Sequence, residues 1–323
     1  MENYSSSYLQ STAQNYVKAA NSATLYKDLA KWIGRTYPLF ILLIGTVGNV
    51  LNYIVLGRTC PGTSIGVLLR AISIGNLMDI WFYISYVWMN YTFNFNIRLT
   101  TNFVCKSFPY LSYVGADFSI FLVVISSLDR LIAVWLPLKF TKFCNVKMAV
   151  IETIILGIVS LLLNVTTLFT RTILPDGTCE FENNWLYYFQ TTIQPWIVFI
   201  FVSLVPEASV IILNILIVAG LAEHKRRMKH MISANANKAA NKIENSTYVL
   251  TIGMSVMFII LYTPILLLNI FEFQFTDKNF YRLLSTIFSM MQHTHHFIDF
   301  YMYLLISDSF RQKFMKGLCK NSA

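Results

Sequence analysis

Apolar and polar residues follow one another along this chain in long blocks, not in the short periods that are typical of a soluble domain. A helix needs about 20 mostly apolar residues to cross a hydrocarbon core of roughly 30 Å. Seven stretches of this kind occur, near residues 35–57, 66–89, 104–136, 147–169, 192–222, 246–273 and 281–306. Short polar segments separate them. The pattern predicts an all-α fold, a bundle of seven transmembrane helices.

Composition supports a membrane protein. Hydrophobic side chains make up 55% of the 323 residues and charged ones only 13%, which is far too apolar for an ordinary soluble domain. The first thirty residues are rich in Ser, Asn, Tyr and Lys, without an apolar stretch long enough for a signal peptide. We therefore expect the first span itself to direct insertion into the membrane.

The basic residues predict an orientation. The segments that follow spans one, three, five and seven carry, with the span ends next to them, 16 Lys and Arg, against 9 on the other side. By the positive-inside rule, the richer side is cytoplasmic. We expect an extracellular tail at 1–34, a transmembrane domain at 35–306 and a cytoplasmic segment at 307–323, in a multi-pass protein of the plasma membrane. The net charge of +9 then reflects topology, and no folded basic domain is predicted that would bind nucleic acid.

The cysteines fit this orientation. Cys105 and Cys179 fall outside, where disulfides persist, whereas Cys60, Cys144 and Cys319 fall inside, where thiols stay reduced. One bridge between Cys105 and Cys179 is the economical interpretation, and two free extracellular thiols are the alternative. The bridge would hold a loop whose Pro-Asp-Gly sequence is typical of a turn.

An acid and a base stand side by side at the end of the third apolar stretch, in SSLDRLIAVWLPLKF. Arg130 follows Cys105 by 25 positions, which is about 37 Å of helix and close to the thickness of a bilayer with its headgroups. If Cys105 lies at the outer surface, Asp129 and Arg130 lie at the inner one.

These features, in this order, resemble the rhodopsin-like class A of G-protein-coupled receptors over nearly the whole chain. Asp-Arg follows the third-helix cysteine at the family spacing, and DFYMY stands where the family has Asn-Pro-x-x-Tyr. Other residues at family positions are Asn49, Asp79, Pro137, Pro206, Phe258, Pro264 and, in a short amphipathic eighth helix on the inner leaflet, Phe310, Arg311 and Phe314. The resemblance implies a receptor that is not an enzyme, with an extracellular ligand and a heterotrimeric G protein as partners.

Several residues depart from the family pattern. Leu131 replaces the usual Tyr, Tyr262 the usual Trp, Phe300 the seventh-helix Pro and Asn214 the fifth-helix Tyr. They suggest a divergent branch near the invertebrate neuropeptide (FMRFamide-like) receptors, some of which also carry Phe at that Pro position.

The resemblance also implies a cytoplasmic switch. In the family, the Arg is held by the adjacent acid and by an acid at the foot of the sixth helix, and counting back 20 residues from Pro264 gives Glu244. Breaking such a pair would free Arg130 to face a G protein. The alternative is that Glu244 is a solvated charge in a polar loop. The residues assigned to coupling are Asp129, Arg130, Glu244, Asn49 and Tyr303.

A second group aligns with the positions that bind a sodium ion in the family. Asp79, Ser119 and Asp299 occupy them, and His295 replaces a common Asn. Two nearby carboxylates repel unless they share a proton or a cation, so the hypothesis is a cation- or proton-sensitive centre, with sodium as the possible ligand. The alternative is that both acids satisfy hydrogen bonds within the bundle.

The histidines of the last span do not suggest a metal site on sequence grounds. His293 and His295 are two residues apart and diverge on a helix, and no compact ligand set is evident around them and His296. Packing and hydrogen bonding are their expected roles, and no other cofactor is predicted.

The residues of the expected ligand pocket limit the choice of ligand. Ser112 stands where amine receptors carry an Asp, which argues against an amine, and His293 stands where opsins carry the retinal-linked Lys. Span seven contains no Lys, which excludes a visual pigment. The pocket is assigned to Ser112, Tyr113, Asp117, Tyr262 and His293.

Aromatic and acidic residues on the outer side favour a basic, amidated peptide. Tyr110, Tyr113 and Asp117 recur at helical spacing, and four acids fall in the outer loops: Glu180, Glu182, Glu272 and Asp277. Such groups suit charge-assisted contacts to Arg and stacking on aromatic rings. Against this, aromatic residues are common at bilayer interfaces and loop acids are usually solvated.

A chemosensory receptor for a small molecule is the main alternative. A transporter is expected to show internal repeats, and we find no convincing one. An intramembrane enzyme would need a nucleophile-base or metal constellation, and no such motif is evident. Asn3-Tyr-Ser is a glycosylation sequon on the tail, and Cys319, behind the amphipathic segment, is a candidate for lipidation.

Overall fold

A computed structural model describes residues 22–60, 62–182, 185–229, 253, 256–271, 275–306, 311–312 and 314–315. Three predicted functional residues, Asn3, Glu244 and Cys319, lie outside these ranges, as do the side chains of Asp299 and Tyr303.

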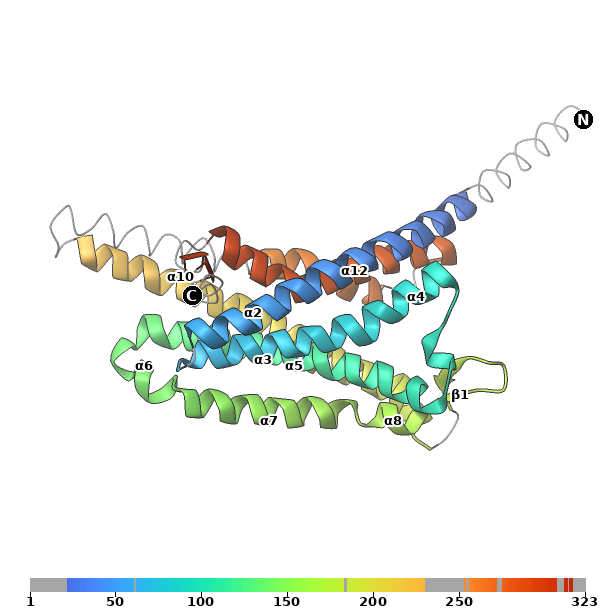
Figure 1. The fold of residues 1–323 in the computed structure, drawn as a ribbon, viewed down its shortest axis with the longest axis horizontal. Helices are drawn as coiled ribbons and strands as arrows, with labels where there is room; N and C mark the ends of the chain where they lie inside the picture. The colour runs from blue at the N-terminus through green and yellow to red at the C-terminus, as the bar shows by residue number, and fades with distance from the viewer. Residues whose placement is uncertain are drawn as a thin grey trace, which may run out of the picture.

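Long helices occupy the predicted places and run side by side (Figure 1). In the described part of the chain, 5 helices are long and apolar enough to cross a membrane: Ser22–Arg58, Ser64–Phe93, Asn102–Trp135, Val146–Thr170 and Phe189–Glu223. A shorter apolar helix, Val256–Ile270, stands at the sixth place, and α12 (Lys278–Ile306, 29 residues) stands at the seventh. The predicted helical bundle is confirmed.

The first helix starts earlier than the hydrophobic pattern indicates. It runs from Ser22 and includes a π-helical segment, η1 (Ile41–Gly45), before α2 (Thr46–Thr59). The expected boundary between residues 34 and 35 therefore falls inside a continuous helix. Hydropathy marks the apolar part of a helix, whereas Ala, Leu and Lys in the preceding turns favour the helix itself. The Tyr26 ring, in this extension, packs 5.2 Å from that of Phe280.

Two more of the spanning helices also change their hydrogen-bond register midway. The second consists of α3 (Ser64–Asp79), a π segment η2 (Ile80–Ile84) and α4 (Ser85–Phe93). The fifth consists of η4 (Phe189–Ile193), α9 (Gln194–Ile197), η5 (Val198–Leu204) and α10 (Val205–Lys229). Because Pro206 has no N–H to donate to the preceding turn, the irregular register of η5 next to it has a local cause.

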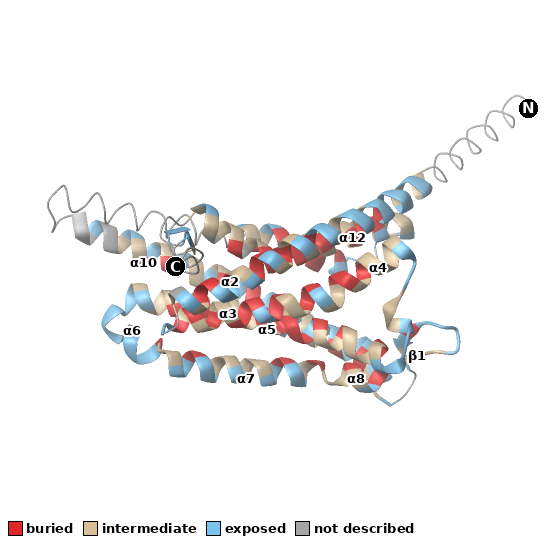
Figure 2. Cartoon of the chain, in the orientation of Figure 1, coloured by how far each residue is buried: buried red, intermediate tan, exposed pale blue. Residues whose placement is uncertain are grey.

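The third spanning helix, α5 (Asn102–Trp135), lies at the centre of the bundle. It contacts α3, α10 and α7 (Val146–Asn164), and its first turn is capped by the Thr101 hydroxyl, which accepts from the Val104 amide. Figure 2 shows that buried positions concentrate on α3 and α5 and that α7 turns an exposed face outward. Leu68, Leu122 and Ala149 are fully buried where these three helices meet.

Glycines bring α3 and α5 into backbone contact. A Cβ added at Gly115 would lie 2.6 Å from the Gly75 carbonyl oxygen, 2.6 Å from the Met78 Cβ and 3.1 Å from the Asp79 amide nitrogen. Close approach of helices at small residues is common in membranes, where dispersion contacts replace the hydrophobic driving force. The two helices can be this close only because residue 115 has no side chain.

A short β-hairpin closes one end of the bundle. Strand β1 (Arg171–Ile173) pairs antiparallel with β2 (Cys179–Phe181), after α8 (Thr166–Thr170). The Pro-Asp-Gly turn forms as predicted, with the Gly177 amide donating to the Leu174 carbonyl at 2.9 Å and Gly177 at φ +76°. The Thr178 hydroxyl and amide both donate to Asp176, which lowers the pKa of that exposed carboxyl.

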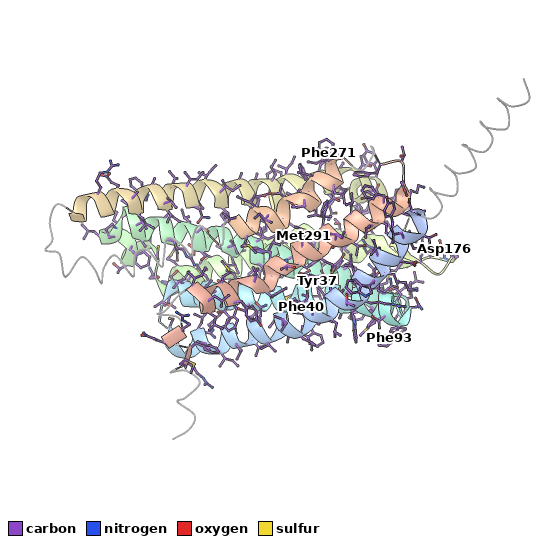
Figure 3. The ribbon with its side chains drawn as sticks, turned by 90° about the horizontal axis from the view of Figure 1, so that it is seen from above. Tyr37, Phe40, Phe93, Asp176, Phe271 and Met291 are labelled. Atoms are coloured by element: carbon purple, nitrogen blue, oxygen red, sulfur yellow. A yellow bond between two sulfur atoms is a disulfide. The ribbon has the colours of Figure 1, made fainter. Side chains whose placement is uncertain are left out.

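The predicted disulfide is present. Cys105, at the start of α5, is bonded to Cys179 of β2 and is fully buried. The Asn102 side chain supports the same junction, because its Oδ1 accepts from the Ile173 amide at 2.8 Å. In Figure 3, Asp176 of the hairpin turn and Phe93, at the end of α4, lie near the same end of the bundle.

The opposite end of the bundle carries α6 (Pro137–Phe143), the loop between α2 and α3, and the last described residues (Figure 1). Residues 311–312 and 314–315 are helical, in the place predicted for the eighth helix. The Phe314 ring packs 5.8 Å from that of Phe300 of α12. Phe300, which replaces the family Pro, thus anchors the chain beyond the last span.

Candidate functional site

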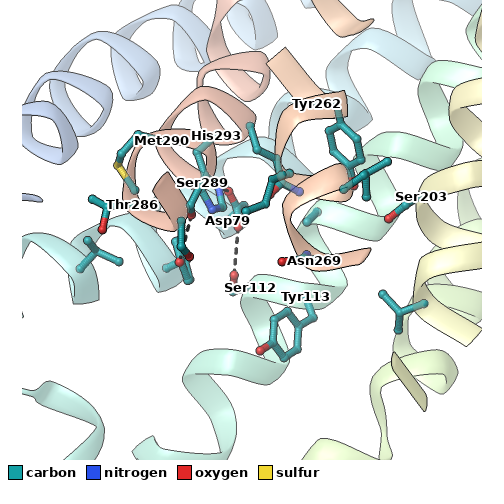
Figure 4. Close-up of a pocket in the computed structure, with 18 of the residues that line it drawn as sticks. Asp79, Ser112, Tyr113, Ser203, Tyr262, Asn269, Thr286, Ser289, Met290 and His293 are labelled. Carbon is teal, nitrogen blue, oxygen red and sulfur yellow. Dashed lines mark hydrogen bonds and ion pairs between the residues drawn. The ribbon is translucent and has the colours of Figure 1, made fainter. Parts of the chain in front are cut away.

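A cavity of about 600 Å³ lies between the helices, toward the hairpin end. Its walls come from α3, η2, α4, α5, η5, the 256–270 helix and α12, and Figure 4 shows several of these side chains directed into one space. All five residues assigned to the pocket from the sequence line it: Ser112, Tyr113, Asp117, Tyr262 and His293. A volume in this range is typical of small-ligand sites.

Asp79, the last residue of α3, lines the cavity and is bonded to residues from two other helices. One carboxylate oxygen accepts from the Ser112 hydroxyl at 2.9 Å, and the other lies 2.6 Å from Nδ1 of His293 on α12 (Figure 4). The His293 ring stacks on Tyr83 at 4.4 Å, and the Tyr83 hydroxyl lies 3.2 Å from that of Ser289. Three helices therefore meet at one carboxylate, which is only 1% exposed.

The polar network continues from Asp79 toward α2. His296 Nε2 lies 3.7 Å from the Asp79 carboxylate, and its Nδ1 lies 3.0 Å from Asn76 Oδ1. The Asn76 amide in turn donates to Asn49 Oδ1 at 3.2 Å, and the Asn49 amide donates to the carbonyls of His296 and Gly45, each at 3.0 Å. Asn49 thus ties α2 to α3 and to α12.

The described partners of Asp79 are Ser112, His293 and His296, which differ from the residues grouped with it as an ion site from the sequence. The Ser119 hydroxyl donates to the Gly115 carbonyl at 2.9 Å, and no hydrogen bond between Ser119 and Asp79 is found among the described residues. The His295 ring packs edge-on against Phe258 at 4.8 Å. Asp79 instead accepts from Ser112, which lies two helical turns from Ser119 on α5. The side chain of Asp299 lies outside the described residues, so the sodium site stays a prediction.

The prediction that the histidines of the last span form no compact ligand set is wrong. Asp79, His293 and His296 each offer a ligand atom, and these atoms all lie within 4.8 Å of one another. Residues three apart on a helix share a face, so His293 and His296 point the same way. The sequence argument compared His293 with His295 and missed this spacing.

The acid-base pair Asp129-Arg130 lies at the opposite end of α5 from the cavity. Asp129 is buried and accepts a hydrogen bond from the Ser64 hydroxyl at the start of α3, while Arg130 is half-buried. Burial raises the pKa of the nearby Cys144 thiol to about 12, and its hydrogen bond to the Asp129 carboxylate adds to the shift. Asp129 is thus held by groups from α3 and from the segment before α7.

Comparison with protein families identifies the fold. The model of the 7 transmembrane receptor (rhodopsin family) matches residues 63–303, well over half of the chain. The chain belongs to this family. No curated protein matches it closely enough to serve as a relative.

Membership makes the chain a multi-pass membrane receptor of class A, which signals through G proteins and is not an enzyme. The cavity between the helices then lies where a receptor of this bundle architecture can admit a ligand, and the Asp129 end lies at the other end of the same helix. The matched segment contains every residue of the Asp79 network except Asn49 and Gly45.

In the part of the chain that the structure describes, two further carboxylates are buried, each with one short hydrogen bond. Asp117 of α5 accepts from the Asn164 amide of α7 at 2.6 Å, and Glu207 of α10 accepts from the Thr263 hydroxyl of the 256–270 helix at 2.6 Å. Asp117 also lines the cavity. Its location was predicted from helical spacing, but the partner on another helix could not be.

Proposed function

We propose that this receptor lies in the plasma membrane with its amino terminus outside, binds a basic, amidated peptide in the cavity, and activates a heterotrimeric G protein at the Asp129 end. The observation that carries the ligand class is the composition of the cavity wall, in which Asp79 and Asp117 stand among the aromatic rings of Tyr83, Tyr113 and Tyr262.

A peptide with Arg next to an amidated aromatic residue matches this wall. A guanidinium can form charge-assisted hydrogen bonds with Asp117 and stack on tyrosine faces. Arg282 of α12 lines the same cavity and supplies donors for the carbonyl of a terminal amide. FMRFamide-like peptides, which end in arginine and an amidated phenylalanine, are the form of ligand that the sequence resemblance suggests.

The ligand test is a G-protein dissociation assay in transfected cells, with amidated neuropeptides and small odorants as the two libraries. We expect a peptide agonist whose potency falls at least about tenfold in Asp117→Asn, which corresponds to about 1.4 kcal/mol. Asp176→Asn, at the exposed hairpin turn, is the matched control and should keep wild-type potency. The free-acid form of the same peptide should be weaker than the amide.

A response to small odorants alone would overturn the peptide assignment. The observation that favours this second candidate is that both cavity carboxylates already have hydrogen-bond partners, Ser112 and His293 for Asp79 and Asn164 for Asp117. A cavity of about 600 Å³ also encloses a small molecule more completely than a peptide. Substrate flux without any G-protein response would instead indicate a transporter.

The coupling mechanism is proposed to be a charge lock at the cytoplasmic end. Arg130 is held in the resting state by Asp129 and by Glu244, and Asn49 and Tyr303 belong to the same switch. The support is the placement of Asp129, which is buried and held by Ser64. A buried carboxylate needs such donors, since an unpaired charge away from water is costly. Glycosylation of Asn3 and lipidation of Cys319 remain predictions.

Removing the Ser64 hydroxyl tests this lock. We expect Ser64→Ala to raise ligand-independent G-protein activation about fivefold, because a resting-state hydrogen bond to a charge of even about 1 kcal/mol shifts a two-state equilibrium by that factor. The measurement is nucleotide exchange on a purified G protein with the receptor in nanodiscs. Ser127→Ala is the control, since the Ser127 hydroxyl donates only to the Val123 carbonyl of its own helix among the described contacts. Equal basal rates in both variants would argue against the lock.

A further inference from the structure

Asp79, His293 and His296 form a buried group of one carboxylate and two imidazoles, and the function proposed above does not explain why the two imidazoles meet at this carboxylate. The side chains come from α3 and α12, and Asp79 and His296 are each 1% exposed. Their ligand atoms already lie within 4.8 Å of one another. Buried ionisable groups within a membrane span are expensive and usually pair with one another or carry a function.

The hydrogen-bond network determines which His296 nitrogen faces Asp79 with a lone pair. The Asn49 amide nitrogen is committed to two backbone carbonyls, of Gly45 and His296, so Asn49 Oδ1 must accept from Asn76. Asn76 therefore turns its Oδ1 toward His296, and Nδ1 of His296 carries the hydrogen that this oxygen accepts. In neutral His296, the electron pair is then on Nε2.

This tautomer places two electron-pair donors face to face. His296 Nε2 lies 3.7 Å from the Asp79 carboxylate oxygen that also lies 2.6 Å from His293 Nδ1. A neutral imidazole nitrogen and a carboxylate repel at this distance unless an electrophile lies between them. A proton is one such electrophile and a metal cation is the other.

We propose that Asp79, His293 and His296 bind a divalent transition metal ion, with Zn²⁺ as the reference ion. Imidazole nitrogen and carboxylate oxygen are preferred ligands of such metals, whereas sodium, calcium and magnesium prefer oxygen alone. Three protein ligands are the usual number in zinc sites that keep a position open. The ion differs from the sodium predicted at this acid because the structure supplies two nitrogen donors.

Small side-chain movements complete the coordination. Zinc bonds of about 2.0–2.2 Å place tetrahedral ligand atoms about 3.3 Å apart. The Asp79–His296 separation of 3.7 Å needs to shorten slightly, and the Asp79–His293 hydrogen bond of 2.6 Å needs to lengthen as His293 Nδ1 loses its hydrogen and becomes a ligand. Neutral His293 then carries its single hydrogen on Nε2, so the change is a shift of tautomer and the imidazole stays neutral.

Surrounding groups already orient the ligands. Asn76 fixes the His296 tautomer, the Ser112 hydroxyl holds the Asp79 carboxylate, and Tyr83 stacks on the His293 ring. Such outer partners are typical of metal sites. Asp79 and His293 also line the cavity, so the fourth position opens toward it and can take water or a group of a bound ligand.

The test uses the full-length receptor purified in detergent, stripped with a chelator, with Cys60, Cys144 and Cys319 replaced by Ser so that thiols do not contribute. Zn²⁺ titration against a chromophoric chelator gives stoichiometry and affinity, and Co²⁺ absorption reports a tetrahedral nitrogen-oxygen site. We expect one equivalent of high-affinity metal in this background. His293→Ala should weaken binding at least about tenfold.

His295→Ala is the matched control, because His295 is adjacent in sequence but packs on Phe258. It should bind metal as the parent does. If the parent protein binds neither Zn²⁺ nor Co²⁺, the proposal is overturned without any variant. In that case nitrogen NMR that shows His296 titrating would identify a proton as the occupant. Equal binding in His293→Ala and His295→Ala overturns it as well. No step depends on the peptide or on G-protein coupling, so the outcome is independent of the proposed function.

Discussion

Gly115→Ala is expected to destabilise the receptor by about 3 kcal/mol, at the upper end of the range for overpacking a close contact. The added Cβ would lie 2.6 Å from the Gly75 carbonyl oxygen, and neither backbone can yield without separating α3 from α5. Separation would also pull Asp79 away from Ser112, which is 2.9 Å distant. The measurement is the thermal unfolding midpoint of purified receptor, together with expression at the cell surface.

Gly157→Ala is a control for which we expect a gain in stability instead of a loss. A Cβ at Gly157 of α7 meets only the Phe118 ring, at 3.7 Å, which is ordinary contact. Without a clash, replacing a helical glycine by alanine stabilises by about 0.4–1 kcal/mol, because the unfolded chain loses freedom. If both variants unfolded at the same temperature, the backbone contact between α3 and α5 would not have the importance assigned to it here.

Loss of the disulfide is expected to lower the free energy of unfolding by about as much as Gly115→Ala does. Cys105 and Cys179 are separated by 74 residues, and the chain-entropy model gives about 4 kcal/mol for a loop of this length. Cys105→Ser should therefore lower the unfolding midpoint and release the hairpin from α5. Thermal unfolding of purified receptor measures the first effect, and hydrogen exchange of the 171–181 amides measures the second.

Cys60→Ser is the control, since Cys60 is half-buried in the loop before α3 and does not belong to the disulfide. A reducing agent should lower the midpoint of the wild type but not that of the doubly substituted Cys105→Ser, Cys179→Ser protein. A double variant that unfolded at the wild-type temperature would show that the Asn102 contacts hold the hairpin without the covalent bond.

Much of the fold could be predicted because a bilayer imposes a minimum helix length on the sequence. The places of all seven helical segments and the disulfide followed from apolar stretches, basic residues and cysteine positions. Helix ends did not. The extension from Ser22 and the π segment after Asp79 depend on contacts such as Tyr26 with Phe280, which pair residues distant in sequence.

The candidate site was only partly predictable for the same reason. Helical spacing and family position located Ser112, Asp117 and His293, which do line one cavity. They did not show that Asp79 belongs with them, because the rotation of α3 relative to α12 depends on tertiary packing. Asn76 was missed, and His296 was assigned only to packing and hydrogen bonding, although the spacing of three residues between Asn76 and Asp79, and again between His293 and His296, was available as a signal.

From the backbone contact between Gly75 and Gly115 we expect α3 and α5 to form a fixed frame, against which the 256–270 helix and α12 form a more mobile wall. A Cβ at either glycine would meet the carbonyl oxygen of the other at 2.6–2.7 Å, so these helices have little room to slide past each other there. Rearrangement is easier where helices meet through long side chains, as Tyr262 does from the 256–270 helix. Asp79 belongs to the frame and His293 to α12, so their 2.6 Å contact connects the two parts. The proton or cation at this contact therefore limits how far we expect the wall to move.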